Sequence, residues 1–439
     1  MRNLNENYFS SANAPSSHAA RSCKNRRAVL RAGHFQKFTA VLLAQIDKNR
    51  YDSRMGKKEY QFETLCVAGD AGYAAHDDTG AISLPIYQSA CYGRSHLGQS
   101  SGFDYTRVSN PTREHLEHTV AALDHAEYGF AFATGMAAIT AFFDMVPQGR
   151  HVIVSEDIYG GTIRLFDNIG TKLGLKFSYI DTSNLQKVAE AFRPETKYVF
   201  IETPGNPLMT VTDIRECARL AHEHGAKLVV DNTFLTPYFQ QPLALGADAV
   251  IQSGSKYLSG HNDTLSGFVT TNDYDIAQNM TFITKTTGAS LSPFDSWLTY
   301  RGIKTLAVRL ERQAQNAMQA ALALQKNPHV SRVLYPGLPD CPGYELNKSQ
   351  ASGFGGMVSF YVDSAERARH ALEKIRLIHF AESLGGTDSL MTYPFTQTHA
   401  DIPEPLRIRK GITENLLRLS VGIENAADII ADLEQALGE

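Results

Sequence analysis

The sequence has few cysteines and no pattern that would pair them or bind a metal. None has the CxxC spacing, and they are odd in number and widely scattered: Cys23, Cys66, Cys91, Cys217 and Cys341. Such an arrangement is a poor basis for a disulfide framework or a thiolate metal site. We therefore expect a cytoplasmic protein in a reducing environment, without a disulfide framework and without a bound metal.

Two further absences exclude whole classes of protein. No apolar run approaches the roughly 20 residues of a membrane-spanning helix, so no membrane segment is expected. Charges of both signs are interspersed and sum to −4, and no basic stripe with interleaved aromatic residues is present. Nucleic acid is therefore not an expected partner. The remaining possibility is a globular chain, and 439 residues with 43% hydrophobic content are enough for two cores.

Acidic residues are almost missing from the start of the chain. Between Met1 and Ile46 the only acid is Glu6, whereas lysine and arginine recur among Ser, Ala and Asn. This composition is typical of an organelle transit peptide, but a disordered extension, or a translation start at Met55, would also account for it. We assign residues 1–54 to an extension that carries no chemistry.

Between Ala131 and Ser255, apolar runs of strand length alternate with longer helical patterns. The strand candidates are residues 151–157, 176–181, 197–203, 227–232 and 248–253. Residues 213–225 have one apolar helical face and end at a capping Gly225. This alternation predicts βαβ units around a buried parallel sheet, the doubly wound α/β pattern.

The pattern changes after Pro293. Residues 296–327 predict a long helix or a helix pair, because strong helix formers dominate there. A smaller α/β domain is predicted from strands at 356–362 and 416–424 and helices at 364–376 and 426–437. Little periodicity is present before the core. We therefore divide the globular chain into an arm, a large domain and a C-terminal domain with a linking helix, at residues 55–110, 111–293 and 294–439.

Polar residues end two neighbouring predicted strands. Asp231 ends the run LVVD, and Lys256 follows AVIQSGS one strand later. Ligands gather beyond the carboxyl ends of parallel strands, so an acid and an amine would share one edge of the sheet. Pyridoxal phosphate chemistry uses both: a lysine forms a Schiff base with the cofactor aldehyde, and an acid keeps the pyridine nitrogen protonated. Taken alone, Lys256 could be a solvated surface lysine and Asp231 a helix cap.

A phosphate site is indicated nearby. The stretch ATGMAAITAFF (133–143) is a glycine-containing turn that leads into a helix, so the amides of Gly135 and Met136 could meet a dianion. Ser253 and Ser255 could donate hydroxyl hydrogen bonds to the same group. A single-glycine turn can also simply cap a helix, and both interpretations stay open from this stretch alone.

Eight motifs occur in chain order: YTRVSNPT (105–112), TGMAAI (134–139), YGGTIRLF (159–166), ETPGNP (202–207), VVDNTF (229–234), SGSKYLSGH (253–261), AESLGG (381–386) and LLRLSVGIE (416–424). Together they resemble the Cys/Met-metabolism family of fold-type I pyridoxal-phosphate enzymes. The resemblance runs from about Glu63 to the C-terminus. It implies a large cofactor-binding domain with a mostly parallel seven-stranded sheet flanked by helices, and a smaller C-terminal α/β domain.

The resemblance also implies roles for single residues. Lys256 would be the Schiff-base lysine and later the proton shuttle, because the displaced amine lies beside the substrate Cα. Asp231 would pair with the pyridine nitrogen, and Tyr159 would stack on the cofactor ring and assist in proton transfer. The expected phosphate ligands are Gly135, Met136, Ser253 and Ser255.

A second group of residues concerns the substrate and a neighbouring subunit. Arg418 resembles the arginine that binds the substrate α-carboxylate, with Asn206 and Ser383 fixing its position. Tyr105 and Arg107 match a Y-x-R element that reaches the cofactor phosphate of a neighbouring subunit, where a guanidinium binds bidentately. The implied assembly is a homo-oligomer with a shared active site, a dimer as minimal unit and a tetramer as the expected state.

The reaction type depends on fewer positions. Glu382 matches the glutamate of cystathionine γ-synthases and γ-lyases that can meet a distal ammonium, and Arg164 is also synthase-like. Gly161 stands where methionine γ-lyases carry a cysteine, which disfavours that activity. We expect small amino-acid substrates and favour γ-replacement on an O-acylhomoserine by cysteine, giving cystathionine. Cystathionine γ-lyase, cystathionine β-lyase and O-acylhomoserine sulfhydrylase remain the alternatives.

Overall fold

The computed structural model describes residues 60–70 and 79–438. The predicted extension, residues 1–54, and the first residues of the predicted arm, 55–59, lie outside these ranges. No helix within the described ranges has both the length and the apolar character to cross a membrane.

The large sheet has seven strands in the order β1-β7-β6-β5-β4-β2-β3. Their bounds are β1 Tyr128–Phe132, β2 His151–Ser155, β3 Lys176–Ile180, β4 Thr196–Glu202, β5 Lys227–Asp231, β6 Ala249–Gln252 and β7 Gly267–Thr271. Strands β6, β5, β4, β2 and β3 are parallel, whereas β7 runs antiparallel to both β6 and β1. The five predicted strands are confirmed, and β1 and β7 were not predicted from the pattern.

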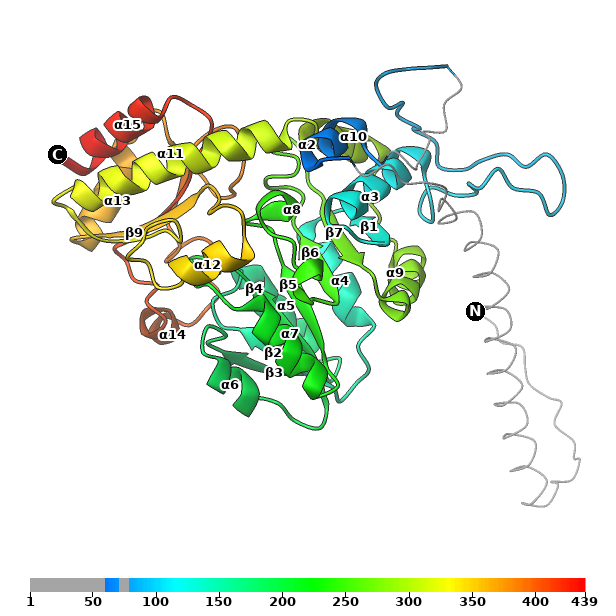
Figure 1. Cartoon of the computed structure of the whole chain (residues 1–439), viewed down its shortest axis with the longest axis horizontal. Coiled ribbons are helices and arrows are strands. Elements are labelled where there is room, and N and C mark those ends of the chain that lie inside the picture. Colours follow the sequence, from blue (N-terminus) through cyan, green and yellow to red (C-terminus); the bar gives the residue numbers. More distant parts are fainter. Residues whose placement is uncertain (1–59, 71–78, 439) are drawn as a thin grey trace, which may run out of the picture. The chain divides into compact units, whose positions relative to one another are not determined.

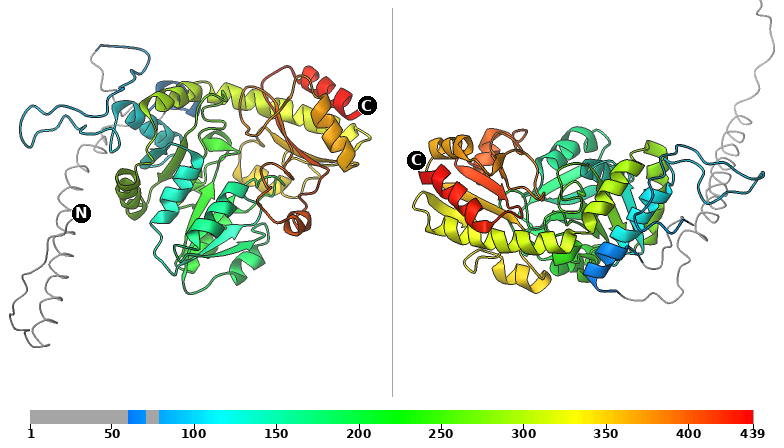
Figure 2. Two further views of the ribbon diagram at one scale, coloured as in Figure 1. Left: turned by 180° about the vertical axis from the view of Figure 1, so that it is seen from behind. Right: turned by 90° about the horizontal axis from the view of Figure 1, so that it is seen from above.

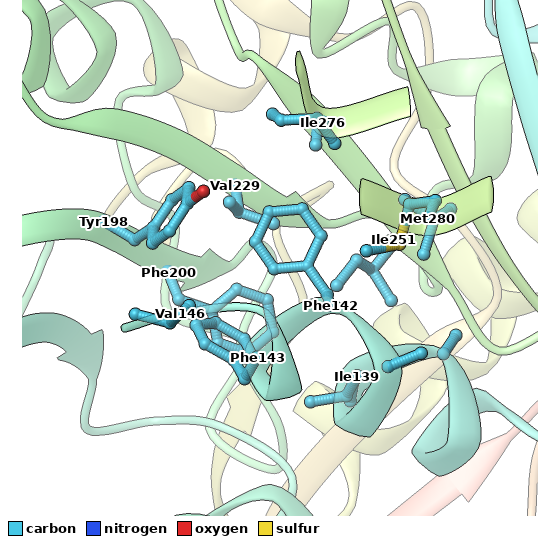
Figure 3. Packing of buried hydrophobic residues seen from close by; sticks show 14 of the residues in the cluster. Ile139, Phe142, Phe143, Val146, Tyr198, Phe200, Val229, Ile251, Ile276 and Met280 are labelled. Carbon is cyan, nitrogen blue, oxygen red and sulfur yellow. The ribbon is translucent and has the colours of Figure 1, made fainter. Parts of the chain in front are cut away.

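Helices cover both faces of this sheet. Successive residues of a strand point to opposite faces, so Val154 shares a core cluster with Phe143, and Ile153 shares another with Ile214. Phe143 lies on α4 (Gly135–Asp144), and Ile214 begins α7 (Ile214–Glu223). Figure 3 shows the aromatic side chains of α4 packed against strand β4. Burial on both faces explains why the strands read as continuous apolar runs.

The predicted helix region after Pro293 is a helix pair, α10 (Pro293–Ile303) and α11 (Leu306–Lys326). Helix α11 joins two cores, because Leu310 packs in the cluster of the large domain and Leu324 in that of the second sheet. Figure 1 shows α11 running from α10 to the neighbourhood of α13 and α15.

The second sheet has five strands in the order β10-β11-β12-β9-β8. Their bounds are β8 Val330–Leu334, β9 Met357–Val362, β10 His379–Phe380, β11 Leu390–Thr392 and β12 Leu416–Ser420. The predicted strands β9 and β12 and the predicted helices α13 (Ala365–Lys374) and α15 (Ala426–Gly438) are confirmed. Strands β8, β10 and β11 were missed. The other helices are α2 Phe62–Ala68, α3 Pro111–Leu123, α5 Gly160–Leu165, α6 Leu185–Glu190, α8 Thr236–Phe239, α9 Tyr274–Thr287, α12 Tyr344–Gln350 and α14 Glu404–Arg409.

The segment 79–110 forms an extended arm. Its described residues contain no helix or named strand, only an isolated bridge between Cys91 and Tyr105. Figures 1 and 2 show it reaching away from both sheets. Its side chains include almost fully exposed Ile82 and Leu97. Within the predicted arm, the described residues before this segment form the short helix α2. The domain boundaries themselves remain predictions.

Candidate active site

A cavity of about 360 Å³ lies at the carboxyl ends of β4, β5 and β6. It is lined by every predicted site residue except Tyr105 and Arg107: Gly135, Met136, Tyr159, Asn206, Asp231, Ser253, Ser255, Lys256, Glu382, Ser383 and Arg418. Thr134, Glu202, Thr233, Leu265 and Thr398 also line it. The large sheet contributes the residues up to Lys256, and the C-terminal part of the chain contributes Arg418 on β12.

Lys256 extends into this cavity from the loop after β6. Its Nζ donates a hydrogen bond of 2.7 Å to Ser383 Oγ. Burial, together with the nearby charge of Arg418, lowers the pKa of Lys256 to about 8. An amine with this pKa is far more often neutral near pH 7 than a surface lysine, and the neutral form is the nucleophile.

Asp231 is the last residue of β5 and is only 8% exposed. Its Oδ1 accepts hydrogen bonds from Thr233 N at 3.0 Å and Thr233 Oγ1 at 2.5 Å. Burial raises the pKa of Asp231 to about 6 in spite of these two bonds. Both bonds go to the same oxygen, so Oδ2 is left for a cationic group within the cavity, which would lower the pKa again.

The start of α4 approaches the loop after β6 very closely. Thr134 caps the helix by accepting a hydrogen bond from Ala137 N at 2.9 Å. A Cβ atom on Gly135 would lie 2.8 Å from Ser253 Cβ and 2.9 Å from Ser253 Oγ. Only glycine therefore lets the helix N-terminus and the serine approach this closely. Amides at the helix start and the hydroxyl of Ser253 together suit a phosphate. The hydroxyl of Ser255 donates to Ser266 O at 3.1 Å, so it would have to rotate to contact the same group.

Arg418 is 2% exposed and makes hydrogen bonds only to neutral acceptors in the described chain. Its Nη1 donates to Asn206 Oδ1 at 2.7 Å, and its Nη2 donates to Ser383 O at 3.3 Å and Thr392 Oγ1 at 3.2 Å. The Nε of Arg418 is buried without a hydrogen-bond partner among the described residues. Burial lowers its pKa to about 10, so the side chain still carries its charge. A buried, unpaired guanidinium calls for an anionic ligand.

Ser383 connects the amine to the arginine. Its hydroxyl accepts from Lys256, and its carbonyl accepts from Arg418. Its φ of 98° is in the left-handed region, which is unfavourable for a residue with a side chain. The two hydrogen bonds stabilise this left-handed conformation of Ser383, which a serine rarely adopts.

The residues expected to select the reaction are only partly brought together. Glu382 is exposed and lines the cavity. The ring of Tyr159 lies over Gly161, where a Cβ atom would be 2.4 Å from the ring. Cysteine at position 161 would therefore displace Tyr159. Arg164 does not line the cavity and forms an exposed ion pair with Asp401 instead.

Tyr105 and Arg107 lie on the arm, outside the cavity of their own chain. Both are exposed, and the guanidinium of Arg107 lies 5.3 Å from the Tyr105 ring centroid. Arg107 Nη1 donates to Lys285 O at the end of α9. The single chain therefore does not bring the predicted Y-x-R element to the cavity.

Three residues of this region were missed in the sequence. Glu202 ends β4 in the same way that Asp231 ends β5, so the rule that identified Asp231 would have identified it too. Thr233 lies in the quoted motif VVDNTF, but only the fold shows that it binds Asp231. His399 Nε2 contacts Asn206 O at 3.1 Å, and burial lowers its pKa to about 3. No local signal distinguishes such a histidine.

Comparison with known proteins agrees with this geometry. Residues 63–438 match the family described as Cys/Met metabolism PLP-dependent enzyme. The chain belongs to this family. Its fold is therefore the predicted fold-type I architecture, and its cofactor is pyridoxal phosphate.

Named relatives of this family member differ in the reaction they catalyse. The chain is 46% identical over 375 residues to the cystathionine gamma-lyase of Bacillus subtilis. This alignment covers 85% of the chain and 98% of that protein. The chain is 47% identical over 380 residues to the cystathionine gamma-synthase of Haemophilus influenzae, covering 86% and 98%. The solved cystathionine gamma-lyase of Lactobacillus plantarum, complexed with L-serine, is 40% identical with a TM-score of 0.84, covering 86% and 99%.

The cavity fits pyridoxal phosphate at three points. The close approach of Gly135 to Ser253 leaves donors for the phosphate, and Lys256 has a lowered pKa suited to the aldehyde. Asp231 has an oxygen without a described hydrogen bond for the ring nitrogen. These chemistries match the three polar ends of the cofactor.

We predict that Gly135→Ala weakens cofactor binding. The added methyl group would collide with Ser253 and separate the phosphate donors. Loss of one hydrogen bond to a charged group should raise the cofactor dissociation constant by about tenfold or more. Fluorescence titration of cofactor-free protein measures this constant. Gly438→Ala is the control, because its Cβ would meet open space. An unchanged constant in Gly135→Ala would contradict the phosphate assignment.

The pKa of Lys256 predicts the pH dependence of cofactor uptake. The neutral amine is the reactive form, so the uptake rate should rise with pH and level off above about 8. The Glu382→Gln variant should level off at lower pH, because the charge of Glu382 raises the pKa of Lys256. Stopped-flow absorbance of cofactor-free protein measures both. A wild-type rate that still climbs at pH 10 would rule out this lowered pKa.

Proposed function

We propose that this enzyme catalyses γ-replacement on an O-acylhomoserine by cysteine, giving cystathionine. The observation that carries the proposal is the unpaired, buried guanidinium of Arg418 in a cavity that Glu382 also lines. A positive group is available for an α-carboxylate, and a negative group for a second, distal ammonium. Cysteine and cystathionine both carry the ammonium that Glu382 would meet.

The residues around Lys256 support proton transfer at the substrate Cα. Bound pyridoxal phosphate supplies the electron sink that makes the α-proton acidic. Lys256 Nζ, with its lowered pKa, is suited to take up this proton and return it. Arg418 holds the carboxylate, so the Cα–H bond is presented to the amine rather than to solvent. Tyr159 lines the cavity and could exchange a further proton at its hydroxyl.

The replacement itself exchanges one bond at Cγ for another. The Cγ–O bond of the ester breaks and a carboxylate leaves, while the Cγ–S bond to the cysteine thiolate forms and the thiol proton is released. Glu382 at the cavity rim supports cysteine as the thiol, because its charge can pair with the cysteine ammonium.

A cystathionine lyase is the second candidate. The same Glu382 could bind the distal ammonium of cystathionine, and one relative at 46% identity is named a gamma-lyase. The charges of Arg418 and Glu382 alone suit both reactions equally well. The two candidates differ in whether water or a thiol completes the reaction.

We also infer that the active site is shared between subunits of a homo-oligomer. Tyr105 and Arg107 lie on an arm that extends away from its own sheets, with exposed apolar side chains. Among the described residues that line the cavity, Arg418 is the only arginine, and we assign it to the substrate carboxylate rather than to the cofactor phosphate. A second copy of the arm would provide an arginine for this phosphate.

Product analysis tests the proposed reaction. The purified enzyme should form cystathionine from O-acetylhomoserine or O-succinylhomoserine and cysteine, and Lys256→Ala should form none, because it lacks the proton-transferring amine. Chromatography with mass detection identifies the product. Keto acid and ammonia from cystathionine, with both esters untouched, would establish the lyase and overturn γ-replacement.

Complementation tests the shared site. Arg107→Ala and Lys256→Ala should each be almost inactive as pure variants. When they are unfolded and refolded together in equal amounts, about half of the dimers should be mixed, and each mixed dimer should regain one of its two sites, because an intact arm then meets an intact lysine. The mixture should therefore regain about a quarter of the wild-type activity. Activity after mixing measures this. No recovery, with mixed dimers demonstrated by mass spectrometry, would place Arg107 outside the neighbouring site.

A further inference from the structure

Glu202 lies beside Asp231 at the carboxyl edge of the large sheet. The two residues are register partners at the ends of β4 and β5. Glu202 is 5% exposed and Asp231 is 8% exposed. Glu202 lines the active-site cavity and also a second, polar cavity of about 260 Å³ next to it. Two buried carboxyl groups therefore share the site where a single cationic ring nitrogen is expected.

Glu202 is connected to Tyr159 as well. Its Oε2 accepts a hydrogen bond of 2.9 Å from Tyr159 N. Tyr159 precedes α5 and has no side-chain cap at this helix start. Its ring lies over Gly161, where a Cβ atom would be 2.4 Å from the ring. The hydrogen bond to Glu202 and the contact with Gly161 together fix where the tyrosine lies in the cavity.

The charges that face Glu202 disfavour its ionised form. Asp231 and Asp157 are acidic neighbours, and Arg418 is the opposing cation. Arg418 donates its described hydrogen bonds to neutral acceptors, and no salt bridge within the described ranges joins it to Glu202. Burial first, and then the charge of Asp231, raise the pKa of Glu202 well above its usual value.

We propose that Glu202 is a positioning residue that acts as a neutral carboxylic acid, holding Tyr159 in the cavity without adding a second negative charge beside Asp231. One oxygen accepts the amide hydrogen of Tyr159, and the other carries the proton. Asp231 then remains the single anion opposite the cofactor ring nitrogen. This inference rests on the proposed function only in the role that it gives to Asp231 and Tyr159.

Two substitutions at Glu202 distinguish the effect of its hydrogen bond to Tyr159 from the effect of its charge. Glu202→Gln keeps an acceptor for Tyr159 N and stays neutral, so kcat should remain within about threefold of wild type. Glu202→Ala removes the acceptor, so kcat should fall by about tenfold to a hundredfold as Tyr159 shifts, with KM little changed. Glu190→Gln on the exposed face of α6 is the control for a carboxylate-to-amide change.

The absorption band of the bound cofactor reports the charge directly. Its pH midpoint should be the same in Glu202→Gln and wild-type holoenzyme, because no charge is lost. A shift of about one pH unit or more would mean that Glu202 is ionised, and would overturn the proposal. A Glu202→Ala enzyme that matches wild type in kcat would overturn the positioning role.

Thermal unfolding of the holoenzyme gives a readout independent of catalysis. A carboxyl group whose pKa is raised by folding keeps its proton in the native state and loses it on unfolding, so the wild type loses stability as pH rises above about 4.5. Glu202→Gln has no carboxyl group at this position and lacks this pH-dependent loss of stability. Its Tm relative to wild type should therefore increase by about 2 °C or more between pH 5 and 8. A difference that stays flat or decreases would show an ionised Glu202.

These outcomes do not depend on which reaction is catalysed. The spectral and unfolding measurements need no substrate, and kcat can be measured with the ester and cysteine or with cystathionine. If γ-replacement fails and the lyase reaction is found, the Glu202 variants are assayed with cystathionine. A failure of the proposed reaction is thus distinguishable from a failure of the Glu202 inference.

Discussion

Arg418 carries a positive charge at a position with 2% exposure, and its described partners are all neutral. Burying such a charge costs free energy unless an anionic ligand pairs with it. Asn206, Thr392 and the strained Ser383 orient the guanidinium, and Ser383 also binds the Lys256 amine. The guanidinium of Arg418 and the amine of Lys256 are therefore held by one set of hydrogen bonds. Disturbing the arginine would change the position of the lysine as well.

The fold provides the two halves of this arrangement. Asp231 and Lys256 lie at the carboxyl edge of the large sheet, whereas Arg418 comes from the second sheet. Helix α11 contributes to the cores of both, so their separation is fixed by packed side chains rather than by a loop. Such a scaffold holds Asp231 and Lys256 at a constant distance from Arg418.

Sequence patterns predicted the parts of the fold that repeat. The buried parallel strands are long apolar runs between helices, so they were recognisable, and Asp231 and Lys256 followed from the places where those runs end. Strand β7 follows β6 with no helix between them in the described chain and runs antiparallel to both β6 and β1, so β1 and β7 depart from the parallel βαβ pattern. Arg418, Ser383 and Asn206 came only from the resemblance, since their contacts join positions far apart in the chain. The arm residues Tyr105 and Arg107 lie outside the cavity of their own chain, and their proposed role requires a second subunit.

The unpaired guanidinium of Arg418 is the centre of this account, and ligand binding tests it most directly. Spectral titration of the holoenzyme with L-alanine and with L-alaninamide compares a carboxylate with a neutral amide on a substrate analogue that has no leaving group. If the ligand carboxylate pairs with the guanidinium of Arg418, alanine should bind about a hundredfold more tightly than alaninamide. Equal dissociation constants would contradict the assignment of Arg418 as the carboxylate site.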